Sequence, residues 1–163
     1  MILESTQPEV FGLLVEWLYT QDIPETHCTD ENIEEHDRNE QELPSTAHLV
    51  NLWLLAEYLQ IPKLQNKALN VLRERVLRNS AFHSSLFHLV YEKTMDDSVL
   101  RKFFVDMMCW SDFSADLIVQ SVSRIQPQMI VDLFTAERKR WMEKIFISPL
   151  YDMSNYLVNE SVM

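Results

Sequence analysis

Glycine is almost absent from this chain: among 163 residues there is one, Gly12. Phosphate-cradling loops, dinucleotide-binding fingerprints and the nucleophile elbow of hydrolases need glycine where the backbone turns tightly or approaches a ligand. None of these motifs can be written with a single glycine, and two-residue hairpin turns are disfavoured for the same reason. The shortage excludes the common nucleotide-binding enzymes and predicts helices rather than sheet.

Cysteines and long apolar runs are also scarce. Two cysteines, Cys28 and Cys109, are too few for a disulfide framework and are typical of a reduced intracellular protein, cytoplasmic or nuclear. No apolar run approaches the roughly 20 residues that span a bilayer. Glu4 and Glu9 stand where a secretory signal would be apolar. We therefore expect an intracellular protein without membrane contact.

Basic residues are outnumbered, with 14 Lys and Arg against 25 Asp and Glu, and the formal charge is −11. This balance argues against nucleic acid as a partner, because phosphate binding needs concentrated cations. Most of the charge is local, since residues 22–42 hold nine acids and one basic residue, Arg38. Residues 21–45 therefore predict an acidic loop. It is either a solvated insertion, which we favour, or a docking loop for a basic partner.

Apolar residues recur at helical spacing along a chain that is 47% apolar and long enough for one domain with a core. Thr6 and Glu9 predict a capping box, and Pro8 suits the first turn of a helix that ends near Thr20. Further helix starts are expected after Ser45, after Pro62, near residue 81, after Asp97 or Ser98, after Ser114 and after Pro127. The prediction is an all-α, or nearly all-α, fold of about six to seven helices, with at most one short strand near Ile2.

The sequence gives only weak signals for a metal-binding or catalytic site. His27, Cys28 and His36 stand among carboxylates, but their spacing fits no zinc signature. A metal-dependent hydrolase built on these three residues is a remote alternative. Cys109 follows Met108 in an apolar stripe, where a buried, inert thiol is expected rather than a nucleophile. We expect no catalytic residue, no metal and no cofactor.

Arg138, Lys139 and Arg140 form the only basic cluster, followed by Trp141 and Lys144. Two functional interpretations are a nuclear-localisation signal and a docking patch for an acidic partner. The structural interpretation, which we favour here, is the solvated side of an amphipathic helix. The opposite, apolar side of that helix would then carry Leu133, Phe134, Trp141 and Ile145.

Three blocks of residues resemble a known family. The first has an aliphatic segment, a Pro-Glu-x-Phe helix start and an aromatic-Leu-Tyr-Thr ending: Ile2, Leu3, Pro8, Glu9, Phe11, Trp17, Leu18, Tyr19 and Thr20. The second is a leucine-rich helix followed by Ile-Pro-x-Leu: Leu49, Leu52, Leu55, Ala56, Glu57, Leu59, Ile61, Pro62 and Leu64. The third comprises 90–94 and 98–103. Together they resemble the C-terminal half of a BTB/POZ domain with the helical extension of its fungal branch.

The resemblance implies an organisation in which 1–79 form this half-domain, 80–147 a helical extension packed on it and 148–163 a loosely tied tail. Gln21 stands where the family usually has glycine, a departure expected to change the turn. The N-terminal half, which supplies much of the family's dimer interface, would precede Ile2. We therefore expect the usual homodimer to be weakened or absent, with these apolar side chains incompletely covered: Phe11, Leu14, Leu18, Leu52, Trp53 and Ala56.

The resemblance further implies a non-enzymatic protein–protein interaction module, in its specific form a substrate adaptor for a cullin ubiquitin ligase. In the family, the segment after the Tyr-Thr helix end lies near the cullin surface. Here that segment is Tyr19, Gln21, Asp22, Ile23 and Pro24. The alternative for Tyr19 and Ile23 is that they edge the core. The alternative for the chain is a truncated or diverged fragment that acts as a structural or transcriptional scaffold.

Overall fold

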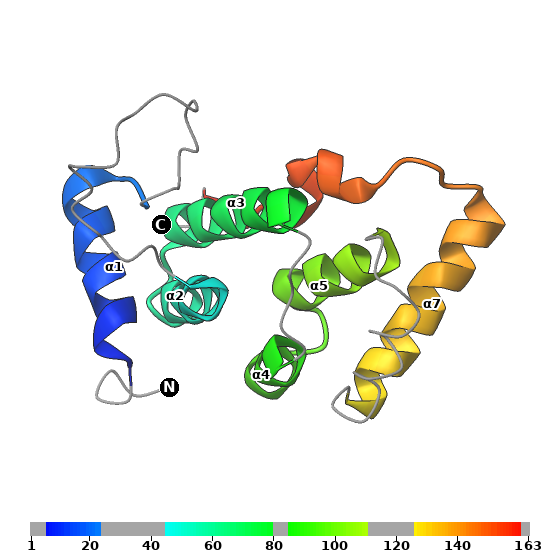
Figure 1. Ribbon diagram of the computed structural model, residues 1–163, viewed down its shortest axis with the longest axis horizontal. Helices are drawn as coiled ribbons and strands as arrows, with labels where there is room; N and C mark the ends of the chain where they lie inside the picture. Colours follow the sequence, from blue (N-terminus) through cyan, green and yellow to red (C-terminus); the bar gives the residue numbers. More distant parts are fainter. Residues whose placement is uncertain (1–5, 24–44, 80–84, 111–125, 161–163) are drawn as a thin grey trace.

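The computed structural model describes residues 6–23, 45–79, 85–110 and 126–160 (Figure 1). These ranges contain no strand, and their helices are α1 (Pro8–Thr20), α2 (Thr46–Tyr58), α3 (Pro62–Asn79), α4 (Ser85–Lys93), α5 (Val99–Trp110), α7 (Pro127–Glu143) and the short 3-10 helices η2 (Pro149–Tyr151) and η3 (Met153–Tyr156). The predicted all-α fold is confirmed. The strand expected near Ile2 and the helix expected after Ser114 lie outside the described residues.

Helix α2 begins as its sequence predicts, whereas α1 does not. The Ser45 hydroxyl accepts the His48 backbone N–H at 3.1 Å, and His48 Nδ1 accepts the Ser45 N–H at 3.3 Å. This reciprocal pair satisfies two amides at the start of α2. At α1 the capping residue is Gln7, which makes no side-chain cap, and the buried Thr6 hydroxyl has no hydrogen-bond partner among the described residues. The predicted capping box of Thr6 and Glu9 is therefore wrong.

Residues other than glycine close three of the described helices. Gln21, Gln60 and Lys144 follow α1, α2 and α7 with φ of 58°, 56° and 52°, the left-handed region that favours glycine. The Gln21 N–H still donates to the Trp17 carbonyl at 2.7 Å, so the left-handed turn forms without a glycine. The single glycine lies instead inside α1.

Helix α2 is the centre of the fold and is apolar on all sides, as expected of a fully covered helix. It packs against α1, α3 and α4, and its buried residues are Leu49, Val50, Leu52, Trp53, Leu54, Leu55 and Ala56. The expectation that Leu52, Trp53 and Ala56 are incompletely covered is therefore wrong. On α1, Leu14 is also buried, but Phe11 and Leu18 are exposed.

Arg101 joins α4 to α5 across the third block of the sequence. Its guanidinium donates to the carbonyl of Tyr91 at 3.0 Å, to the carbonyl of Thr94 and to the Thr94 hydroxyl at 2.9 Å. It also lies over the Tyr91 ring and pairs with the exposed Asp96 at 2.6 Å. The side chain of Arg101 is buried and satisfies carbonyls that the end of α4 leaves without partners. Residues 90–94 and 98–103 are therefore one packed unit.

The C-terminal segment is tied to the core rather than loose. Leu150 and Tyr156 are buried, and the Tyr156 hydroxyl donates to Asp106 on α5 at 2.7 Å. The Asn66 amide of α3 donates to the Val158 carbonyl at 3.0 Å and accepts the Val158 N–H at 2.7 Å. One cluster of buried side chains extends from α1 to η3, across the boundary expected at 79/80. Residues 148–160 are thus part of the same core, contrary to the prediction.

Candidate protein-interaction surface

The predicted partner-binding segment is only partly at the surface. Tyr19 is 88% exposed, and Gln21 and Asp22 are exposed beside it. Ile23 is 1% exposed and belongs to the core, as the alternative interpretation held. Tyr19 does not follow that alternative, since its ring points into solvent. Pro24 lies outside the described residues.

The turn after α1 is held by a set of local polar contacts. The Thr20 hydroxyl donates to the Glu16 carbonyl at 2.8 Å and accepts the Asp22 N–H at 3.1 Å. Asp22 pairs with Lys67 of α3 at 2.7 Å and accepts the Ile23 N–H at 2.9 Å. With Ile23 buried, these contacts fix the backbone that follows α1, and the last turn of α1 presents Tyr19 to solvent beside it.

The described residues hold no group of three or more His, Cys, Asp and Glu side chains that could bind a metal ion. His27, Cys28 and His36 are outside these ranges. Burial, followed by the proximity of Glu137, raises the pKa of the Cys109 thiol to about 12. A thiol with such a pKa is protonated at neutral pH and is a poor nucleophile. The raised pKa of the partly buried Cys109 thiol weighs against a nucleophilic role.

Helix α7 lies at one edge of the molecule (Figure 1). Several of its large apolar side chains are exposed. Only Met129 of α7 is fully buried. At about 100° per residue, a set of exposed side chains shares the opposite side of the helix, with Arg138 at its centre. This set, named here the α7 outward face, consists of Ile130, Val131, Phe134, Arg138, Trp141 and Met142.

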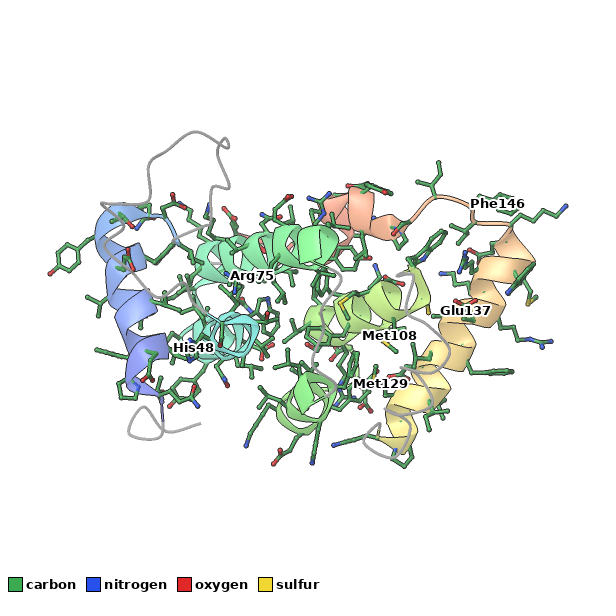
Figure 2. All side chains as sticks on the ribbon, viewed as in Figure 1. His48, Arg75, Met108, Met129, Glu137 and Phe146 are labelled. Carbon is green, nitrogen blue, oxygen red and sulfur yellow. The ribbon has the colours of Figure 1, made fainter. Side chains whose placement is uncertain are left out.

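Three large aromatic side chains are exposed on or beside this face. Phe134 is 68% exposed and Trp141 78%, and the adjoining Phe146 is 82% exposed. Figure 2 shows Phe146 beyond the end of α7. Aromatic side chains present about 150–250 Å² each, so these three alone expose on the order of 500 Å². The largest apolar patch on a typical monomer is about 300–600 Å² and often marks an interaction site, so this surface is a candidate for one.

The inward side of α7 is smaller and more polar than the outward face. Met129, labelled in Figure 2, is buried, and Leu133 and Ala136 pack on the core from the same side of α7, which contacts α5. The guanidinium of Arg140 lies 3.9 Å from the centroid of the Trp110 ring and donates to the Cys109 carbonyl at 3.0 Å.

A further polar contact, from the Tyr91 hydroxyl of α4 to Asp132 at 2.8 Å, holds the first half of α7. The predicted inward packing of Phe134, Trp141 and Ile145 is therefore wrong, and of that predicted set only Leu133 reaches the core. The sequence signal for this arrangement is a second stripe at helical spacing: Met129, Leu133, Ala136 and Arg140.

Charges on the two sides of α7 differ in how they are neutralised. Glu137 pairs with Arg140 at 3.3 Å on the inward side. Arg138 and Lys144 are exposed, and neither has an ion-pair partner among the residues that the structure describes. The α7 outward face thus combines a large apolar area with one cation, Arg138, in a chain of net charge −11.

Comparison with protein-family models, with curated proteins and with solved structures finds no match for this chain. No helix within the described ranges is long and apolar enough to cross a membrane. What the α7 outward face can bind is therefore inferred from its shape and charge.

Proposed function

We propose that this protein is a non-enzymatic protein–protein interaction module of the cell interior. The observation that carries the proposal is the α7 outward face, with Phe134 and Trp141 largely in solvent. Burial of apolar surface contributes about 25 cal/mol per Å², so covering about 500 Å² contributes on the order of 10 kcal/mol before the costs of association. A partner protein is the most direct source of such cover.

The specific form that we propose is a substrate adaptor that resembles fungal BTB/POZ proteins and contacts a cullin. The exposed ring of Tyr19, in the last turn of α1 and beside the segment fastened by Asp22 and Ile23, supports this form. An exposed tyrosine on a helix is a favourable contact residue, because it supplies a large amphipathic surface at low cost in side-chain entropy.

The adaptor form is tested by titrating a fluorescently labelled cullin N-terminal region with the full chain and measuring anisotropy. We expect saturable binding that Tyr19→Glu weakens at least tenfold. The matched control is Tyr58→Glu, since Tyr58 is an exposed tyrosine at the end of α2. Ile23 is not a useful test position, because a charge at this buried site would unfold the turn. Absence of wild-type binding, or equal loss in both variants, would refute the adaptor form.

A further inference from the structure

We infer that the α7 outward face binds an acidic amphipathic helix of a partner protein, with a carboxylate of that helix seated on Arg138. The inference rests on the proposed interaction function and specifies the partner's chemistry. The proposed binding site lies on α7 alone and does not involve Tyr19.

The shape of the face fits a helix. Ile130, Phe134 and Trp141 lie four and seven residues apart, which places them in one row along α7. A 17-residue helix is about 25 Å long, so the row offers a ridge of several turns. Ridges of this kind pack into the grooves of a second helix laid along the first. Recognition of an amphipathic helix through such anchors is a recurring mode of peptide binding.

The charge of the face selects an acidic helix. Arg138 lies within the apolar area, so a partner helix that covers Phe134 and Trp141 also lies close to the guanidinium. Burying an unpaired charge is strongly unfavourable, whereas a carboxylate makes a bidentate, charge-assisted pair with arginine. The exposed Lys144 adds cationic charge at the end of the face, and Glu143 is the opposing acid beside it. The partner's apolar stripe must therefore contain a carboxylate near its middle.

A second copy of this chain fits the face poorly. Arg138 is close to the midpoint of residues 130–145, so a two-fold antiparallel pairing through this face would bring the two guanidinium groups together. Each copy also carries a net charge of −11, which opposes association and equally opposes docking on an anionic membrane. A separate acidic helix avoids the meeting of two guanidinium groups, because its carboxylate lies directly against Arg138.

The test uses two synthetic 18-residue helices labelled with fluorescein. Both carry leucine at i, i+3, i+4 and i+7 spacing. One has glutamate at the remaining positions and once within the leucine stripe, and the other has lysine at those places. Titration with the full chain is followed by anisotropy. We expect the acidic helix to bind at least tenfold more tightly than the basic one, and to weaken severalfold when salt rises from about 0.1 to 0.5 M, where screening is stronger.

Two variants locate the binding. Phe134→Asp removes an anchor and adds repulsion, and we expect it to abolish the preference for the acidic helix. Tyr151→Asp places the same charge at another exposed aromatic residue, outside α7, and we expect wild-type binding. Both positions are exposed, so folding is maintained, and circular dichroism of the two variants checks this.

Four outcomes overturn the inference. Equal binding of the two helices, or binding of neither, excludes the acidic class but leaves the adaptor assay with the cullin region to decide the proposed function. Self-association that Phe134→Asp abolishes would show that a second copy occupies the face. Binding of anionic phospholipid vesicles that requires Phe134 would assign the face to a membrane surface and would count against both the inference and the module.

Discussion

Replacing Arg101 with methionine tests the junction between α4 and α5. The guanidinium satisfies the carbonyls of Tyr91 and Thr94 and the Thr94 hydroxyl, all in a buried setting. Methionine has a similar length but donates no hydrogen bond, so these acceptors lose their partner. The ion pair with Asp96 contributes little by comparison, because the Asp96 side chain is 91% exposed.

The expected loss follows from these contacts. A buried polar group left without its partner costs about 1–3 kcal/mol, and a few such groups are affected at once. Allowing for partial rehydration, we expect Arg101→Met to lower the free energy of unfolding by about 3–5 kcal/mol. Arg101→Lys keeps the charge but not the fork of donors, and an intermediate loss is expected. The measurement is urea denaturation followed by circular dichroism at neutral pH.

The matched control is Lys93→Met, which removes an exposed cation at the end of α4. We expect this variant to stay within about 0.5 kcal/mol of the wild type. If Arg101→Met also stays within about 1 kcal/mol, Arg101 does not hold the junction and the account of residues 90–103 is refuted.

Three further substitutions probe the backbone and the C-terminal segment. Gly12→Ala should stabilise the protein by about 1 kcal/mol, because nothing lies within 4 Å of the added Cβ and alanine is the better helix former. Gln60→Gly should stabilise it by up to about 1 kcal/mol, since φ at Gln60 is 56°. Burial raises the pKa of the Asp106 carboxyl in the folded protein. The protonated carboxyl therefore contributes fully to stability below the ordinary aspartate pKa, and this contribution is lost as pH rises through the raised, folded-state pKa. Asp106→Asn should therefore gain stability relative to the wild type above about pH 4.

The stability changes of Gly12→Ala and Gln60→Gly are measured by thermal unfolding. That of Asp106→Asn is measured by urea denaturation at several pH values. A destabilised Gly12→Ala would contradict the open space beside α1. A stability difference for Asp106→Asn that does not change with pH would contradict the effect of burial on Asp106.

Much of the fold was predictable because helix starts are local. Ser45 and the prolines at 8, 62 and 127 mark helix starts through groups within one turn, which a sequence displays directly. The left-handed residues at helix ends were harder to foresee. Gln21, Gln60 and Lys144 adopt conformations that glycine favours, and only the surrounding packing selects them.

The candidate surface was the part that local patterns did not settle. Helix α7 carries two stripes at helical spacing, one through Met129 and Leu133 and one through Phe134 and Trp141. Which stripe faces inward depends on contacts with other elements, among them the bond from Tyr91 to Asp132. The C-terminal segment was missed for a similar reason, because its anchors are long-range bonds to Asn66 and Asp106 rather than a periodic pattern.

A charge-swap cycle on Arg138 tests most directly whether the α7 outward face binds an acidic helix. Binding is measured for wild type and Arg138→Glu, each with the acidic peptide and with the same peptide carrying lysine in place of its central glutamate. The account predicts that either single swap weakens binding at least tenfold, and that the double swap returns the affinity to within about threefold of the original pair. A double swap as weak as the two single losses combined would contradict it.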